Sequence, residues 1–155
     1  MVLPKYLSRY AVMVSELIEI IGDRMNSNCK GNIALGQAVA YFTAKEYIVS
    51  LPLNDSQWYD MIIEKDGVFK TIQVKYTSQL DKSEKYYKCY LRSISGTSRK
   101  PIYSVIDTPV DYLFCYCDNG DKYLIPAKEI PNKSCITLTK EKIRRSFDTS
   151  NYYII

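Results

Sequence analysis

The chain has 155 residues, no histidine, and a formal charge of +4 at neutral pH from 21 basic and 17 acidic side chains. This length suits one domain with a sizeable core, and the missing imidazole excludes Ser-His-Asp and Cys-His triads and histidine-ligated zinc or haem. Any chemistry must therefore use carboxylates, lysine, tyrosine or cysteine. A mildly basic chain with 15 tyrosines suits a nucleic-acid partner without requiring one.

The cysteines and the N-terminal residues indicate the compartment in which the chain works. The five cysteines form an odd set without Cys-x-x-Cys spacing, which argues against a disulfide framework or a zinc cluster and indicates reduced thiols. Lys5 and Arg9 interrupt the first apolar residues, and no stretch approaches the roughly 18 apolar residues that a membrane span needs. We therefore expect a cytoplasmic protein without a membrane partner.

The first part of the chain has the periodicity of helices. Apolar residues at three- and four-residue steps predict an amphipathic helix over about residues 5–25. Alanine-rich residues 32–45 predict a second helix, whose small side chains favour close packing against a sheet. The period then changes to two, which predicts strands over 47–51, 58–64 and 68–76. Asp66-Gly67 between the last two predicts a tight hairpin.

The second half predicts more strands. Residues 86–92 alternate as a strand, and residues 93–101 are typical of an exposed basic loop. The nearly continuous apolar run 111–117 predicts a strand covered on both faces, followed by a turn at Asp118-Asn119-Gly120 and a partner strand over 121–126. We also expect a helical turn over 127–130.

The sequence predicts a single domain. Neither an internal repeat nor a linker divides the chain. We therefore expect a single domain over 1–155, with residues 1–29 as an N-terminal helical extension and residues 140–155 as a polar tail.

The hairpin also carries the candidate site. Asp60 opens one strand, and Gln73 and Lys75 alternate onto one face of the partner strand, where core residues are expected. Polar residues that break an otherwise consistent pattern often mark a functional site. A solvated hairpin face explains this pattern equally well.

The ordered motifs around these residues resemble a known family. They resemble the PD-(D/E)XK nuclease superfamily and, within it, the homing endonucleases encoded in cyanobacterial group I introns, whose motif likewise carries glutamine. The resemblance implies an α/β fold with a restriction-endonuclease-like core, a mixed central β-sheet flanked by helices, here with an added N-terminal helix. It extends more weakly to Pro126 and leaves the first 29 residues and the tail outside. The motifs are Lys30-Gly31-Asn-Ile-Ala, the alanine-rich helix, Tyr47-Ile-Val, Pro52, Asp60-Met-Ile-Ile and Ile72-Gln73-Val74-Lys75-Tyr76.

The function that this resemblance implies is site-specific, Mg²⁺-dependent cleavage of double-stranded DNA by a homo-oligomer, a dimer or a tetramer. The same core also serves Holliday junction resolvases and other DNA nucleases, which remain alternatives. Asp60, Gln73 and the carbonyl of Val74 would bind Mg²⁺, with Mn²⁺ as an alternative ion, because hard cations prefer oxygen ligands. Lys75 would position the attacking water and stabilise negative charge.

One position departs from the family pattern. The family carries a glutamate on its first core helix, and Leu35 occupies that position here. Gln37 could substitute in part by hydrogen bonding to a metal-bound water. Otherwise the chain is a catalytically impaired DNA-binding relative.

A basic segment after the hairpin is the predicted DNA-binding region. Its side chains would contact phosphates, and the loop over 93–101 would reach base edges, whereas a solvated basic face is the alternative. The predicted contacts are Lys82, Lys85, Arg92, Ser95, Thr97, Arg99 and Lys100.

Overall fold

The computed structural model describes residues 26–54, 57–92, 104–131, 134–142 and 147–154. The chain divides into two units, residues 1–30 and residues 31–155. The predicted helix over 5–25 and the predicted loop over 93–101 lie outside the described residues. None of the helices in the described part of the chain is both long and apolar enough to cross a membrane.

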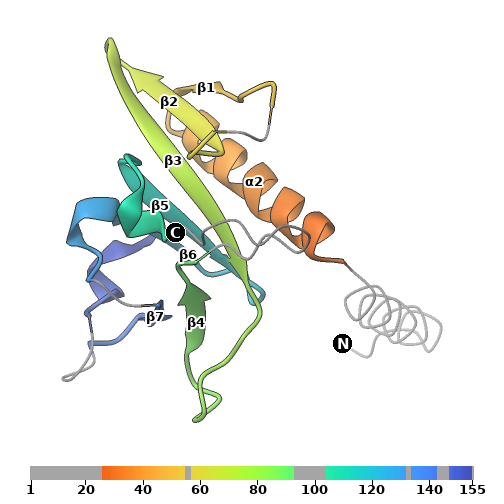
Figure 1. Ribbon diagram of the computed structural model, residues 1–155, viewed down its shortest axis with the longest axis vertical. Coiled ribbons are helices and arrows are strands. Elements are labelled where there is room, and N and C mark those ends of the chain that lie inside the picture. The colour runs from red at the N-terminus through yellow and green to blue at the C-terminus, as the bar shows by residue number, and fades with distance from the viewer. Residues whose placement is uncertain (1–25, 55–56, 93–103, 132–133, 143–146, 155) are drawn as a thin grey trace, which may run out of the picture. The chain divides into compact units, whose positions relative to one another are not determined.

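A mixed sheet forms the centre of the second unit (Figure 1). Its strands lie in the order β1-β2-β3-β5-β6-β8, and every neighbouring pair is antiparallel except β3 and β5, which are parallel. Such a mixed sheet with a flanking helix confirms the predicted α/β fold class. The strands are β1 (Ile48–Ser50), β2 (Met61–Lys65), β3 (Val68–Thr77), β5 (Tyr112–Cys117), β6 (Lys122–Pro126) and β8 (Tyr153–Ile154).

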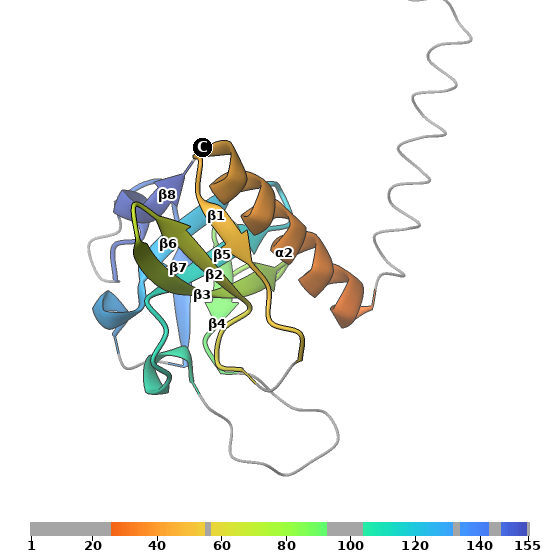
Figure 2. The ribbon, with the colours of Figure 1, turned by 90° about the horizontal axis from the view of Figure 1, so that it is seen from above.

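The helix α2 (Ser27–Ala44) begins five residues before the predicted start at 32. Its first turn is stabilised by the side chain of Asn26, whose Oδ1 accepts a hydrogen bond of 2.9 Å from the backbone N–H of Cys29. Farther along, α2 runs beside the sheet (Figure 1 and Figure 2). Ala38 and Phe42 are buried there against Ile72 and Phe114, among other residues of one apolar cluster.

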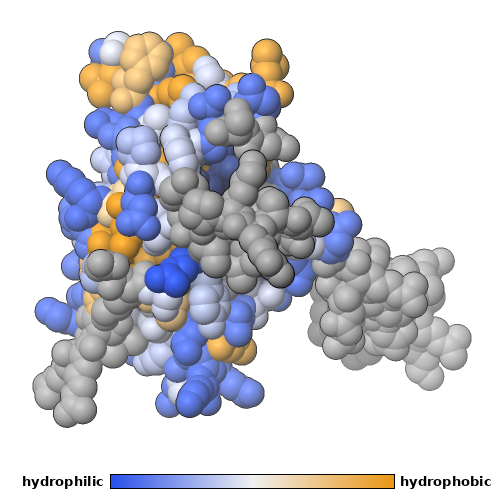
Figure 3. Space-filling model, in the orientation of Figure 1, coloured by the Kyte–Doolittle hydropathy of each residue, from blue (hydrophilic) through white to orange (hydrophobic). Residues whose placement is uncertain are grey.

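Two tight turns fix the local pairings of the sheet. Asp66 and Gly67 have φ angles of 53° and 76°, so the β2–β3 hairpin has the left-handed turn that the Asp-Gly pair predicts. Gly120, with a φ of 89°, lies in the turn between β5 and β6. The exposed side chains of Val68 and Phe69 follow the first turn, and Figure 3 shows hydrophobic surface at this end of the molecule.

A second, two-stranded sheet lies in the other half of the fold. It pairs β4 (Tyr87–Tyr90) with β7 (Cys135–Leu138), and it forms an apolar cluster with Leu113, Cys115 and Cys117 of β5. The central strand β5 is therefore covered on both faces, as its apolar run predicts, because Phe114 contributes to the cluster beside α2. The short 3-10 helices are η1 (Val105–Asp107), η2 (Ala127–Glu129) and η3 (Ser150–Tyr152).

Candidate active site

Asp60 lies just before β2 and is held against β3. Its backbone N–H donates to the carbonyl of Ile72 over 2.9 Å. Its carboxylate oxygen Oδ2 accepts hydrogen bonds of 2.6 Å from both the side-chain Nε2 of Gln73 and the backbone N–H of Val74. The structure therefore brings together three residues that sequence reasoning selected, and two donors orient the carboxylate.

Lys75 lies on the same face of β3 as Gln73, because side chains alternate along a strand. It pairs in register with Cys115 of β5, whose Sγ is 3.4 Å from the Sγ of Cys89. Burial raises the pKa of the Cys115 thiol, and the neighbouring Lys75 ammonium opposes this shift only weakly. Lys75 is therefore next to a buried pair of thiols on the β5 side of β3, whereas Asp60 lies on the β2 side.

The candidate site and α2 lie on opposite faces of the sheet. Ile72 and Val74 pack in the apolar cluster beside α2, so Gln73 and Lys75, one residue out of phase, point to the other face. Leu35 packs half-buried against the same cluster as Ile72. Its predicted role at the position of the family glutamate stays a prediction, and the structure gives its side chain a packing function.

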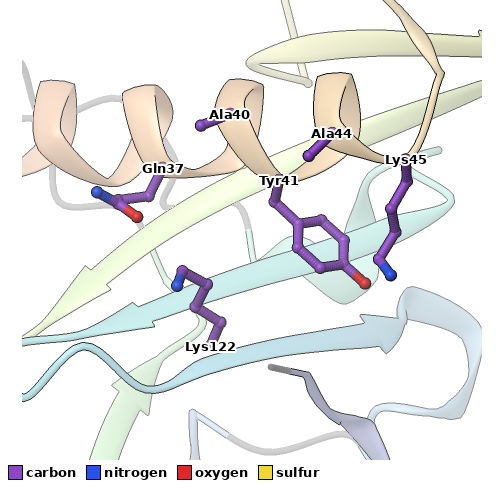
Figure 4. A pocket seen from close by; sticks show the side chains of 6 residues that line it. All are labelled: Gln37, Ala40, Tyr41, Ala44, Lys45 and Lys122. Carbon is purple, nitrogen blue, oxygen red and sulfur yellow. The ribbon is translucent and has the colours of Figure 1, made fainter.

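Gln37 lies on the α2 side as well. It lines a groove of about 300 Å³ together with Tyr41, Lys45 and Lys122. In Figure 4, Gln37 and Tyr41 project from α2 towards the strand that carries Lys122. The structure thus gives Gln37 surroundings unlike those of Asp60.

The donor set around Asp60 fits a hard divalent cation by its chemistry. Gln73 faces Asp60 with Nε2, so Oε1 is the amide atom that would face a cation, beside the second carboxylate oxygen of Asp60 and the carbonyl of Val74. All three are oxygen ligands, which Mg²⁺ prefers. Among the described residues, no three or more His, Cys, Asp or Glu side chains are grouped to hold a metal. With a single carboxylate, the site should bind Mg²⁺ more weakly than one with two.

The predicted DNA contacts lie partly within the described residues. Lys82, Lys85 and Arg92 are exposed. The carboxylate of Asp81 accepts hydrogen bonds from the hydroxyl of Ser83 and from the backbone N–H groups of Lys85 and Tyr86, which order this connection. The remaining predicted contacts, Ser95, Thr97, Arg99 and Lys100, lie outside the described residues.

The structure adds a polar cluster that sequence reasoning missed. The carboxylate of Asp111, just before β5, accepts hydrogen bonds from Lys70 Nζ and from the N–H and hydroxyl of Thr71. Partial burial acts to raise the pKa of Asp111, but these donors outweigh it and hold the pKa below its usual value. The only sequence signal is Asp111 at the head of an apolar strand, because its partners lie 40 and 41 residues away.

Comparison with known proteins agrees with this geometry. The model of a family described as PD-(D/E)XK endonuclease matches residues 25–153. A solved structure of a bacterial homing endonuclease, I-Ssp6803I, is similar to the chain with a TM-score of 0.67 and 25% identity, over 83% of this chain and 89% of that one. Comparison with curated protein sequences gave no match. A match of this extent, on a mixed sheet with Asp60, Gln73 and Lys75 on one face, shows that the chain belongs to the PD-(D/E)XK endonuclease family.

Proposed function

We propose that this chain is a site-specific, Mg²⁺-dependent endonuclease that hydrolyses phosphodiester bonds of double-stranded DNA, and that it is of the homing type. The observation that supports the reaction is the carboxylate of Asp60, oriented by two hydrogen bonds on the same sheet face as Lys75. The homing type is supported by the similarity to I-Ssp6803I, which is itself a homing endonuclease.

Each residue would have a distinct task. The N–H of Val74 and the amide of Gln73 hold Asp60 in one orientation, and its other carboxylate oxygen would help to bind the ion. Mg²⁺ in such a site supplies polarisation of the scissile phosphate and a lower pKa for a bound water. Lys75 would hold that water and offset the negative charge that grows on the phosphate. Because the chain lacks histidine, proton transfer would fall to Lys75 and solvent.

The proposal includes a homo-oligomer. One compact site attacks one strand, so cleavage of a duplex needs two sites or sequential rebinding. Two-fold symmetry that matches a near-palindromic DNA is the simplest arrangement, as a dimer or as a pair of dimers.

Two substitutions test the reaction. In Asp60→Asn the side chain can still accept from Gln73 and Val74 but has lost its charge, and Lys75→Ala removes the ammonium. We expect each to lower the rate of Mg²⁺-dependent plasmid nicking by about 100-fold or more while DNA affinity changes little. Nicking rates over a magnesium titration, an EDTA-treated sample and a filter-binding assay measure these effects.

The matched control is Asp121→Asn, which removes one carboxylate charge just before β6 instead of at the site. It should cleave like the parent chain. Parental nicking rates in both Asp60→Asn and Lys75→Ala would overturn the assignment. Cleavage of linear duplex and of four-way junctions distinguishes a homing endonuclease from a resolvase, because a resolvase prefers the junction.

A catalytically impaired DNA-binding relative is the second candidate. The observation that favours it is Leu35, which is half-buried in apolar packing at the position where the resemblance implies a glutamate. An apolar side chain cannot bind or orient a metal-bound water.

Leu35→Glu tests this candidate. If Leu35 occupies a vacant ligand position, the variant should cleave faster than the parent chain at limiting Mg²⁺, despite some loss of packing. Leu35→Gln is the control, since it has a similar shape without the charge. Equal or lower cleavage in Leu35→Glu across the magnesium titration would show that this position is not the missing ligand.

A further inference from the structure

The polar cluster at the head of β5 connects two strands that are distant in sequence. Thr71 donates to Asp111 Oδ2 through its N–H (2.9 Å) and its hydroxyl (3.0 Å). The backbone N–H of Asp111 in turn donates to the carbonyl of Thr71 over 3.1 Å and lies 3.0 Å from its hydroxyl oxygen. Lys70 Nζ adds a contact of 2.9 Å to Asp111 Oδ1. Asp111, just before β5, thus holds both the main chain and the side chain of Thr71 on β3.

The position of this contact matters because β3 and β5 are parallel, the only parallel pair among the described strands. No tight turn joins them, so their register depends on contacts between the strands. A shift of one residue would turn every β3 side chain to the other face, and a shift of two would move it by roughly 6.6 Å.

The residues that follow Thr71 on β3 are those of the candidate site. Gln73 and Lys75 lie two and four residues farther along, on the same face, and pair in register with Leu113 and Cys115 of β5. We propose that Asp111 is a positioning residue for the active strand: through Thr71 it fixes the register of β3 on β5 and so holds Gln73 and Lys75 in place beside Asp60. This inference rests on the proposed function for its catalytic consequence.

The hydrogen bonds between Asp111 and Thr71 should fix the strand register more than the ion pair between Lys70 and Asp111 does. The side chains of Lys70 and Asp111 are 42% and 34% exposed, and exposed ion pairs contribute little to stability. Thr71→Val removes the hydroxyl but keeps the backbone N–H that donates to Asp111, so it should reproduce part of the effect of Asp111→Ala. Lys70→Met should have a small effect. Asp111→Asn, whose Oδ1 can still accept from Thr71, should restore most of the function.

Asp111→Ala is the main variant, and Asp121→Ala is its matched control. Asp121 also accepts from a lysine, Lys140, over 2.7 Å, but it lies just before β6, a strand that β5 separates from β3 in the sheet. The first measurement is amide hydrogen exchange without DNA, at Val74, whose N–H donates to Asp60, and at Cys89 in the second sheet as an internal reference. The second is the single-turnover cleavage rate at saturating protein, with DNA affinity measured separately.

We expect Asp111→Ala to raise Val74 exchange by about tenfold relative to Cys89, and to lower the single-turnover rate by about tenfold or more at unchanged DNA affinity. Exchange that rises equally at Val74 and Cys89, or that matches the Asp121→Ala control, would overturn the inference. If the parent chain shows no Mg²⁺-dependent cleavage, the proposed function fails. In that case the amide exchange rate of Val74 by itself tests whether Asp111 fixes the position of β3.

Discussion

Asp60, Gln73 and Lys75 show how much of a site can be predicted one residue at a time. All three lie on one hairpin, so alternation and the Asp66-Gly67 turn are sufficient to place them on one face. Asp111 could not be found in this way, because its contact with Thr71 spans 40 residues. Such a contact depends on which strands become neighbours, and no local pattern encodes this.

The lowered pKa of Asp111 predicts that the stability of the fold depends on pH. Hydrogen bonds from Thr71 and Lys70 hold this pKa below its usual value, and the pKa of Lys70 is raised mainly by its hydrogen bond to Asp111. A carboxyl with a depressed folded-state pKa stabilises the fold above its unfolded pKa of about 4 and loses this contribution as the pH falls through the folded value. Asp111→Asn should therefore be less stable than the parent chain near neutral pH and equally stable in acid.

Urea unfolding of both proteins at a series of pH values measures this difference. The free-energy gap between them should close as the pH falls below about 4. A gap that is constant across the series would show that the charge of Asp111 does not contribute to stability.

Elements were predictable where their pattern is local. The periodicity of α2, the two hairpins, the doubly covered β5 and the helical turn η2 all follow from periodicity or turn residues. The strands β7 and β8 were missed because each is only four or two residues long and exists through a distant partner, β4 for the first and β6 for the second. The segment from residue 140, predicted as a polar tail, thus contributes an edge strand in its described part.

The connection between β3 and β4 carries an element-scale prediction about DNA. Asp81 orders this connection, which exposes Lys82 and Lys85. The double substitution Lys82→Gln with Lys85→Gln should weaken DNA binding for all sequences alike. It should also lower the slope of log affinity against log salt by about two, because each lost phosphate contact releases about one counterion fewer.

Fluorescence anisotropy with labelled duplex at several salt concentrations gives both quantities. Lys128→Gln, which removes an exposed lysine from η2, is the single-charge control and should leave the slope unchanged. An unchanged slope in the double variant would place the phosphate contacts elsewhere on the chain.

At the scale of the whole molecule, the sheet separates packing from chemistry. Phe42 of α2 is 2% exposed, and its ring lies 5.6 Å from that of Tyr47 and 6.2 Å from that of Phe114. Asp60, Gln73 and Lys75 belong to the opposite face. Packing contacts between α2 and the sheet should therefore determine the free energy of unfolding, with little effect on the cleavage rate.

Phe42→Ala tests this separation. It should lower the free energy of unfolding by about 3–5 kcal/mol, because it removes a buried ring and leaves a cavity. The single-turnover cleavage rate per folded molecule should stay within about twofold of the parent rate, since a substitution on the far face leaves the site geometry intact.

The control for Phe42→Ala is Phe69→Ala. The Phe69 side chain is 69% exposed, so its loss should change stability by about 0.5 kcal/mol or less. Urea unfolding and the cleavage rate at a temperature where both variants are folded provide the readouts. A tenfold slower rate in fully folded Phe42→Ala would show that the two faces are coupled.

The separation of the packed α2 face from the face with Asp60 also affects how the protein can be engineered. Side chains beneath α2 and side chains around Asp60 lie on opposite faces of the sheet, so the effects of substituting them should combine independently. A heat-resistant form could then be selected by repacking the α2 side alone, and a form with an altered site by changing the opposite side alone. The two could be joined in one chain without a second round of selection.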